Sequence, residues 1–280
     1  MTSTRTTGDA RGPEVRRQSA VRALYAGNAR AVLGRELAAT RSTTWTVILS
    51  GFFEPVFYLL AMGKGLGAFI GDVTLPSGQV VSYAAFIAPG LLAVSAMNGA
   101  VYDSTWNVFF KMNMGGRLFQ SMLTTSIGPL DVALGEIAFA LLRGGAYAAA
   151  FLVIMQVLGL VLSPWALLAV PAVLLIAFGF ASIGMAITSY MTTIQQMDVI
   201  NTVLLPMFLF SATFYPITVY PEPVQWVVKA FPLWHAVELI RGLTTGALSG
   251  AMLGHLTYFV VMIAVGITFT AKRLRALFLD

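Results

Sequence analysis

The chain is dominated by long apolar segments that are separated by short polar ones. Six of them reach the roughly 20 residues that an α-helix needs to cross the hydrocarbon of a bilayer. They lie near residues 43–62, 82–102, 134–160, 165–190, 198–217 and 253–271. This pattern predicts an all-α integral membrane protein with six transmembrane helices.

The region before the first apolar segment is polar and basic. Residues 1 to about 17 contain Gly and Pro without apolar periodicity, which favours a disordered tail rather than a signal peptide. In residues 18–40 apolar side chains interleave with arginines, so we expect an amphipathic helix that lies along the lipid headgroups. A solvated helix before the first span suits the same residues. We therefore divide the chain into an N-terminal part, residues 1–42, and a transmembrane domain, residues 43–280.

The segment between the fifth and sixth apolar segments is too apolar for a loop and too broken for a span. Two short apolar helices are expected there, at 223–231 and 233–242, with Pro232 between them. Neither is long enough to cross, but such a pair can enter the outer leaflet and return where protein or a cavity shields the broken backbone. We predict a re-entrant helical hairpin over residues 218–243, on the exit side of a transport path.

Composition and charge agree with a membrane protein. The 280 residues are 58% hydrophobic and 10% charged, whereas about 25% of a typical soluble domain is charged. The net charge of +5 does not indicate nucleic-acid binding, because the basic residues gather near the ends of the chain. There is no cysteine, which excludes disulfides and cysteine metal sites.

The distribution of Lys and Arg predicts the orientation in the membrane. With six spans, thirteen of the seventeen lie on the side of the termini, three lie on the other side, and Arg143 lies within a span. By the positive-inside rule, both termini are then cytoplasmic. Arginine outnumbers lysine, and alanine and glycine are abundant, a composition that favours a bacterial protein, so we expect the plasma membrane of a bacterium.

Charged side chains within spans are costly and are therefore candidates for function. Glu54, directly before Pro55, is either a pathway residue that contacts substrate or carries a proton, or a structural acceptor beside a proline kink. Arg143 lies two turns after Glu136 on the same helix face. Either this pair tethers the end of the span, or Arg143 extends toward the cytoplasmic headgroups, which we prefer.

Within the predicted hairpin, His235, Glu238 and Arg241 recur every three residues and so share a helix face. We expect Glu238 and Arg241 to form an ion pair that fixes the hairpin. A metal site of His235, Glu238 and His255 lacks a fourth ligand, so we predict none. Trp234 either stacks on a departing substrate or anchors the hairpin at the membrane interface.

The sequence contains no catalytic motif. Residues 61–67, AMGKGLG, include Gly-Lys-Gly but lack the upstream glycine, at Tyr58, and the Ser or Thr that follows the lysine in a phosphate-binding loop. There is no G-x-S-x-G nucleophile motif, and two histidines are too few for a zincin site. We predict a transport protein that is not an enzyme and binds no cofactor of its own.

Three segments, in this order and spacing, resemble the permease subunits of type-2 ABC exporters. They are FFEPVFYLLAMGKGLG (52–67), LTTSIGPLDVALGEIAFALLRG (123–144) and PMFLFSATFYPITVYPEPVQWVVKAFPLWHAVELIRGL (206–243). The resemblance extends over about residues 20–278. It is strongest with the branch that contains the nodulation-factor exporter permease and the daunorubicin-resistance permeases.

The resemblance implies six transmembrane helices, an interfacial helix before them, and a re-entrant hairpin between the fifth and sixth. It also implies pairing with a second permease copy or a homologous permease, and with cytoplasmic ATPase subunits that bind ATP and Mg. A short helix within residues 103–125 would sit in a cleft of the ATPase. Its candidate contact residues are Phe109, Phe110, Lys111, Met112 and Arg117, although these residues equally suit an extension of the second span.

The sequence thus predicts the membrane subunit of an ATP-driven exporter that moves a hydrophobic or amphipathic molecule outward, such as a drug, a lipid or a lipid-linked saccharide. The candidate pathway residues are Glu54, Asn98, Tyr102, Phe210 and Tyr215, and those of the hairpin are Trp234, His235, Glu238 and Arg241. The alternative is a proton-coupled secondary transporter with Glu54 as the carrier. Such transporters often contain inverted repeats, and the two halves of this sequence show no clear similarity.

Overall fold

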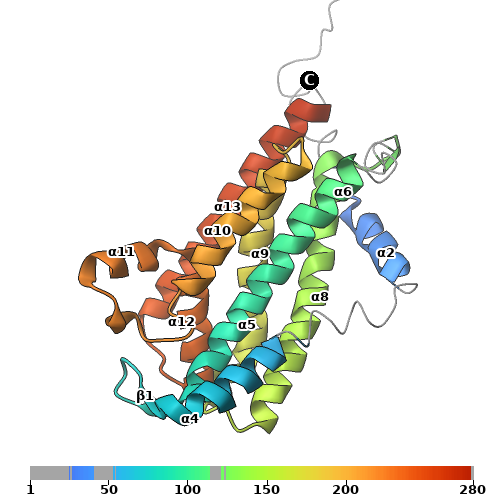
Figure 1. Ribbon diagram of the computed structural model, residues 1–280. Helices are drawn as coiled ribbons and strands as arrows, with labels where there is room; N and C mark the ends of the chain where they lie inside the picture. Colours follow the sequence, from blue (N-terminus) through green and yellow to red (C-terminus); the bar gives the residue numbers. More distant parts are fainter. Residues whose placement is uncertain are drawn as a thin grey trace, which may run out of the picture.

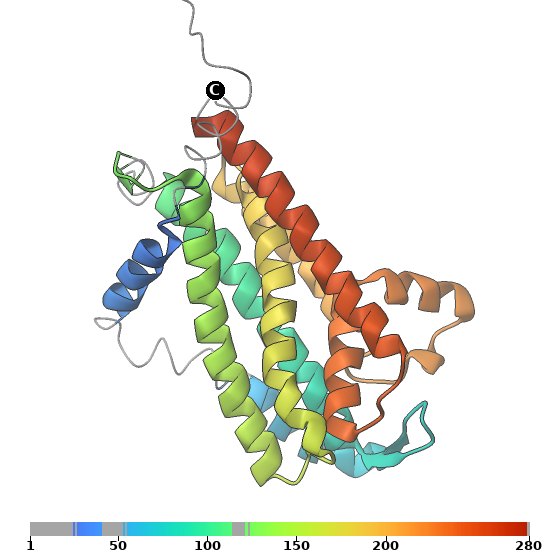
Figure 2. The ribbon, with the colours of Figure 1, turned by 180° about the vertical axis from the view of Figure 1, so that it is seen from behind.

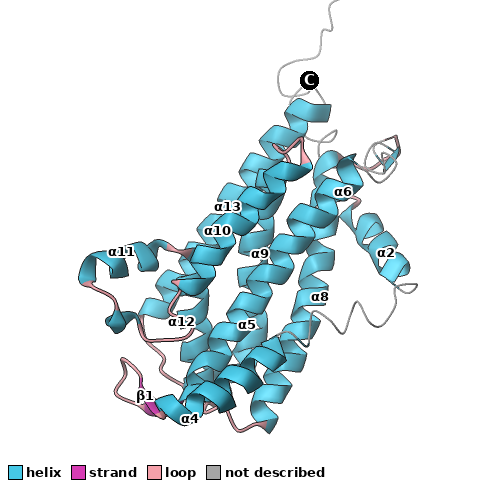
Figure 3. Ribbon diagram, in the orientation of Figure 1, coloured by secondary structure: helices cyan, strands magenta, loops and turns pink. Residues whose placement is uncertain are grey.

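The computed structural model describes residues 25, 27–40, 53, 55–113, 121, 122 and 124–278. Long helices lie side by side in a bundle, with some shorter elements near its two ends and the helices Ala29–Thr40 and Glu222–Ala230 beside it (Figure 1). In the described part of the chain, strands form only one short hairpin (Figure 3). The expected first span, near 43–62, lies largely outside the described residues.

The helices follow one another from α2 near the N-terminus to α13 near the C-terminus. In chain order they are α2 (Ala29–Thr40), η1 (Ala61–Leu66), α4 (Gly67–Ile70), α5 (Tyr83–Tyr102), η2 (Asp103–Asn107), α6 (Val108–Asn113), α8 (Pro129–Val157), η3 (Pro164–Leu168), α9 (Ala169–Thr188), η4 (Ile194–Gln196), α10 (Met197–Leu209), η5 (Ile217–Val219), α11 (Glu222–Ala230), α12 (Pro232–Thr245) and α13 (Ala251–Phe278). Strands β1 (Asp72–Thr74) and β2 (Val80–Ser82) pair antiparallel before α5.

Four helical stretches in the described part of the chain are long and apolar enough to cross a membrane. They are Tyr83–Asn113, Pro129–Val157, Pro164–Thr188 and Ala251–Ala276, and a shorter apolar helix covers Pro55–Ile70. The predicted class, an all-α membrane protein, is therefore confirmed.

Helix α10 differs from the expected fifth span, because it ends at Leu209 and not near residue 217. A turn follows in which Ala212 has a φ of 57°. Few residues other than glycine adopt this left-handed backbone conformation, and it cannot continue a right-handed helix. The apolar character of the segment predicted one continuous span over residues 198–217 and did not reveal this break.

The start of α8 is tied to the start of α2. Pro129 occupies the first turn of α8, where its missing N–H costs nothing. The Asp131 carboxylate accepts hydrogen bonds from the backbone N–H groups of Gly128 (2.9 Å), Gly27 (3.1 Å) and Asn28 (3.2 Å). One buried carboxylate thus caps α8 and holds the residues that lead into α2.

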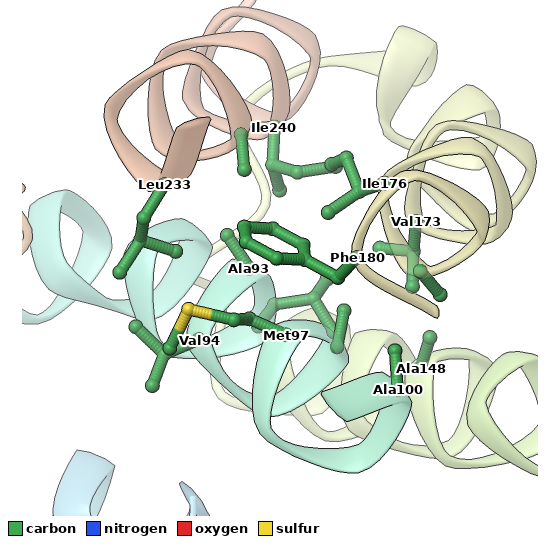
Figure 4. Close-up of a cluster of buried hydrophobic side chains, with 14 of the residues drawn as sticks. Ala93, Val94, Met97, Ala100, Ala148, Val173, Ile176, Phe180, Leu233 and Ile240 are labelled. Atoms are coloured by element: carbon green, nitrogen blue, oxygen red, sulfur yellow. The ribbon is translucent and has the colours of Figure 1, made fainter. Parts of the chain in front are cut away.

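The core lies between α5, α9 and α12. Ile176 and Phe180 of α9 point toward Met97 of α5 and Ile240 of α12 (Figure 4). Because lipid tails are as apolar as these side chains, close packing holds such a bundle together more than the hydrophobic effect does.

Glycines allow the closest helix contacts. Helix α13 runs along α9 (Figure 2), and a Cβ added to Gly266 of α13 would come within 2.6 Å of the backbone carbonyl carbon of Ser182 in α9. Likewise, a Cβ on Gly179 would meet the ring of Phe259 at 2.8 Å. The small residues therefore permit a backbone approach that any side chain would prevent.

Helices α5, η2 and α6 form one continuous rod, Tyr83–Asn113. The middle segment, η2, is a π-helix, a form that is uncommon and frequent at functional sites. The backbone carbonyl of Ser104 in this segment accepts a hydrogen bond of 3.2 Å from the Thr188 hydroxyl of α9. The neighbouring helix thus satisfies part of the irregular backbone.

The predicted hairpin region contains two short helices with different surroundings. Helix α11 projects away from the bundle, whereas α12 packs within it (Figure 1). The Trp226 side chain of α11 is 73% exposed, but most of α12 is buried. Pro232 occupies the first turn of α12 and separates the two helices.

Candidate functional site

Two groups of charged side chains lie near the two ends of the rod Tyr83–Asn113. The first, which we call the Lys111 cluster, consists of Arg35, Glu36, Lys111 and Glu136. The second, the Arg241 cluster, consists of Arg241 and Glu238 with the groups that Arg241 contacts. A third pair, Asp103 and Arg143, lies between them, where η2 begins.

In the Lys111 cluster, one lysine bridges two carboxylates from two other helices. The Lys111 Nζ of α6 lies 2.6 Å from Glu136 Oε2 of α8 and 3.0 Å from Glu36 Oε1 of α2. Arg35 pairs with Glu36 and lies 3.5 Å from Glu136 Oε1. The Glu136 side chain is only 5% exposed, so it depends on these partners to remain ionised.

Tight packing places α2 where these charges can meet. A Cβ on Gly135 of α8 would lie 2.5 Å from Val32 Cβ and 2.9 Å from the Ala29 carbonyl oxygen. Val32 is fully buried in this contact. Together with the Asp131 cap and the Lys111 cluster, this contact joins α2, α6 and α8 into one unit.

The structure separates the residues expected to contact an ATPase. Phe109 is buried and Met112 packs against the core, while Lys111 is engaged within the cluster. Phe110 is 39% exposed, with its ring 6.0 Å from that of Trp106. Arg117 lies outside the described residues. Phe110 is thus the accessible aromatic side chain of this helix.

Two of the predicted pathway residues lie on one face of α5. Of the twenty residues of α5, all of them described, only Asn98 and Tyr102 are exposed, and they are one turn apart. Glu54 lies outside the described residues. A helix that is otherwise buried therefore presents one amide and one phenol to its surroundings.

The other two predicted pathway residues follow the end of α10. The Tyr215 hydroxyl donates to the Leu209 carbonyl at 3.0 Å and lies 2.5 Å from the Tyr220 hydroxyl. The half-exposed ring of Phe210 lies 6.1 Å from the ring of Tyr220. These aromatic residues cover the end of α10 on the side of η5.

In the Arg241 cluster, every donor nitrogen of a buried arginine has an acceptor. Arg241 of α12 is 4% exposed. Its Nη1 donates to Glu238 Oε1 at 2.6 Å, Nη2 to the Ala212 carbonyl at 2.9 Å, and Nε to the Phe86 carbonyl at 3.3 Å. The guanidinium carbon also lies 4.0 Å from the centre of the Phe86 ring, a cation–π contact. The predicted Glu238–Arg241 ion pair is confirmed.

The same cluster fixes the turn that ends α10. The Ala212 carbonyl that Arg241 binds belongs to the residue with positive φ. On either side of it, the hydroxyls of Ser211 and Thr213 lie 2.7 Å apart. A Cβ on Gly90 of α5 would be only 2.9 Å from Thr213 Cγ2. Surrounding contacts thus stabilise a backbone conformation that alanine alone disfavours.

The two histidines form a pair between α12 and α13. The Nδ1 atoms of His235 and His255 are 2.7 Å apart, and the Tyr258 ring stacks on His235 at 4.1 Å. Burial, and then the nearby His255, lower the pKa of His235 to about 4, so His235 is neutral at neutral pH and the two rings share one hydrogen bond. In the described part of the chain, no group of three or more His, Cys, Asp or Glu side chains is placed to hold a metal ion.

The expectations for Glu136 and Arg143 are wrong. Arg143 pairs neither with Glu136 nor with the headgroups, but with Asp103 Oδ1 of η2, which also accepts a hydrogen bond of 2.8 Å from Asn107. Glu136 pairs instead with Lys111. The partners belong to other helices, and the spacing along one helix does not reveal them. Asp103 was not singled out from the sequence, although it lies at the end of a span.

Comparison with known proteins identifies the family. Residues 28–245 match the sequence model of the family described as ABC-2 type transporter. This match covers more than half of the chain, which therefore belongs to the ABC-2 type transporter family. Members of this family are membrane permeases, which serve as transport subunits and are not themselves catalytic.

The chain is also similar to curated proteins of rhizobia. It is 30% identical over 246 residues to "Nodulation protein J" of Rhizobium leguminosarum bv. viciae, over 88% of this chain and 93% of that protein. It is 32% identical over 212 residues to "Nodulation protein J" of Sinorhizobium fredii (strain NBRC 101917 / NGR234), over 75% and 79%. The predicted resemblance is thus confirmed, and the chain is an ABC exporter permease of the membrane.

Proposed function

We propose that this permease is the membrane subunit of an ATP-driven exporter whose energy comes from separate cytoplasmic ATPase subunits that bind ATP and Mg. The substrate would be a hydrophobic or amphipathic molecule, such as a drug, a lipid or a lipid-linked saccharide, moved outward. The observation that carries this proposal is the exposed Phe110 on a helix that continues directly into the buried α5.

Phe110 is suited to contact a partner protein, and the Lys111 cluster is suited to couple a movement of α6 to α2 and α8. Exposed aromatic and methionine side chains are typical of the centre of protein interfaces. Because Lys111 binds acceptors on α2 and α8, a displacement of α6 would move three helices together. A movement of α6 caused by the ATPase would be transmitted to the transmembrane bundle directly, because α6 continues into α5 without a loop.

We propose that this end of the bundle faces the cytoplasm, in the plasma membrane of a bacterium. The C-terminal end of α13, with Lys272, Arg273 and Arg275, lies at the same end as α6 (Figure 1). The positive-inside rule favours this orientation. Strands β1 and β2 lie at the other end of the bundle and would face outward.

We also propose six spans, with Pro55–Ile70 as part of the first, α10 as the fifth, and α11 with α12 as the re-entrant hairpin. Because the chain has no cysteine, single cysteines can test this arrangement directly. We expect Ser77→Cys, between β1 and β2, and Glu222→Cys, in α11, to react with a membrane-impermeant maleimide in intact cells. Thr124→Cys should react only after permeabilisation. Labelling of Thr124→Cys in intact cells would contradict the orientation.

The exposed apolar side chains support pairing with a second copy or a homologous permease. On α10 these are Val199, Val203, Leu205 and Leu209, and on Pro55–Ile70 they include Phe57 and Phe69. We propose that these faces pack against the second permease. The transport path would then pass Asn98 and Tyr102 of α5 and the aromatic residues after α10.

The decisive experiment is purification of the tagged chain from its native membrane in mild detergent, with identification of its partners and an ATPase assay. We expect an ATPase subunit in stoichiometric amount. Phe110→Asp should lower ATPase retention or transport-linked ATP hydrolysis at least about tenfold, because it places a charge at the centre of the interface. Phe110→Leu, which keeps the apolar surface, serves as the control. A permease that repeatedly purifies without an ATPase would contradict the proposal.

A further inference from the structure

Two histidines connect α12, a helix of the predicted hairpin, to α13. His235 of α12 is half-buried and His255 of α13 is buried, and their Nδ1 atoms lie 2.7 Å apart. At this distance the two nitrogens form a hydrogen bond only if one of them carries a proton and the other does not. A proton on both Nδ1 atoms would replace the bond by repulsion between two charged rings.

Aromatic side chains enclose this histidine pair. The Tyr258 ring stacks on His235 with 4.1 Å between the ring centres. The Trp234 ring stands edge to face against both histidines, 4.9 Å from His235 and 5.2 Å from His255. These rings occupy space in which water would otherwise solvate a charged imidazole. The enclosure therefore favours two neutral histidines over two protonated ones.

The charged side chains around the pair do not compensate two added protons. The carboxylate whose charge reaches His255 is that of Glu238, and it already pairs with Arg241 at 2.6 Å. Glu222 and Lys229 belong to α11, which projects away from the bundle (Figure 1). Helices α5, α9 and η3, which also pack against α12, contain no Lys, Arg, His, Asp or Glu, and the Lys and Arg of α13 lie near its other end.

The pKa of His235 gives the pH range in which the contact weakens. Burial, and then the nearby His255, lower this pKa to about 4, whereas an imidazole in water has a pKa near 6.5. If α12 separates from α13, the solvated rings bind protons below about pH 6.5, but the closed pair resists protonation down to about pH 4. Between these values, each fall of one pH unit favours the separated form by up to about tenfold for every proton that separation takes up.

The position of the pair connects it to the turn that ends α10. His255 is the fifth residue of α13, about 6 Å from the start of that helix, in the half of the bundle that contains β1 and β2 (Figure 2). Six residues after His235, α12 carries Arg241, which donates to the Ala212 carbonyl at 2.9 Å. A movement of α12 away from α13 would therefore also act on the turn at Ala212.

We propose that the His235–His255 pair is a proton-sensitive contact that holds α12 against α13 at neutral pH and releases it when the surroundings become acidic. The pair thus adds a regulatory role to the hairpin. This role rests on the proposed function only for the side of the membrane whose pH matters, which would be the outside. A pair with a purely structural role would stay closed until the whole protein unfolds.

Distances between two spin labels test this proposal on the full chain in lipid nanodiscs. Because the chain has no cysteine, labels are introduced at two exposed positions, Val227→Cys in α11 and Val265→Cys in α13. We expect one distance at about pH 7.5 and a second, longer distance that grows reversibly as the pH falls to about 4.5. A control pair, Val157→Cys in α8 with Val265→Cys, should keep its distance. An unchanged distribution for the first pair, or a change in the control pair, would overturn the proposal.

Matched variants assign the pH response to the histidines. His235→Gln and His255→Gln each remove one titrating ring and should reduce the response, and the double variant should abolish it. Tyr258→Phe removes a hydroxyl that donates to the Ala230 carbonyl at 3.1 Å, but no group that titrates in this range, and should retain the response. An equal response in the double variant and the wild type would refute the proposal. Both faces of a nanodisc share one pH and the assay needs no ATPase, so its outcome is independent of the orientation and of the partner.

Discussion

Arg241→Met is expected to lower the free energy of unfolding by about 3–5 kcal/mol, because the change removes one partner of a buried ion pair. Methionine retains much of the side-chain volume but none of the donors. The carbonyls of Phe86 and Ala212 then lose the hydrogen bonds that Arg241 donates to them, and Glu238 loses its counter-ion. The turn at Ala212, which has positive φ, also loses a contact that stabilises it.

The measurement is thermal unfolding of the purified permease in detergent, followed by gel filtration. Arg241→Lys should recover only a minor part of the loss, because an ammonium group lacks the planar fork that reaches three acceptors at once. Glu238→Gln should cost less, since the Glu238 side chain is 28% exposed. If the Arg241→Met variant unfolds at the same temperature as the wild type, the Arg241 cluster does not stabilise the turn at Ala212.

Lys111→Met is the second substitution with a large expected effect. It leaves Glu36 and Glu136, both almost fully buried, with only the partly exposed Arg35 as a cationic partner in the cluster. We expect a loss of about 3 kcal/mol. Because Lys111 connects α6 to α2, the amides of α2 should also exchange hydrogen faster than in the wild type.

A double-mutant cycle separates the ion pair from other effects of the change. Lys111→Met combined with Glu136→Gln should be more stable than the sum of the single losses, because it removes the unpaired buried charge. Arg35→Gln is the matched control in the same cluster. The Arg35 side chain is 36% exposed, so its loss should cost less than about 1 kcal/mol. Additive losses in the cycle would show that Lys111 and Glu136 do not interact.

Structural features that are determined by one local stretch of sequence, such as a membrane span or a helix boundary, could be predicted. The apolar runs that became α5, α8, α9 and α13 are visible because a membrane requires both length and low polarity. Pro232 marks the boundary between α11 and α12, since the first turn of a helix is the position where proline is best tolerated.

Features that depend on contacts between helices could not be predicted. Asp103 with Arg143, and Lys111 with Glu136, are 40 and 25 residues apart in the chain, and no local pattern connects them. The end of α10 was missed for a different reason. An alanine carries no sign that its φ will be positive, because the turn is stabilised from other helices, by the hydrogen bond from Arg241 to the Ala212 carbonyl and by the packing of Thr213 against Gly90.

The continuous helix Tyr83–Asn113 connects the surroundings of Phe86 directly to those of Phe110. Phe86, which contacts Arg241, and Phe110, which faces the solvent, lie about 36 Å apart on one rod. A continuous helix that tilts about its middle moves its two ends in opposite directions. In the proposed exporter, closure around Phe110 and loosening around Phe86 would then be a single movement, so the two sides of the membrane would be kept from opening together by one helix.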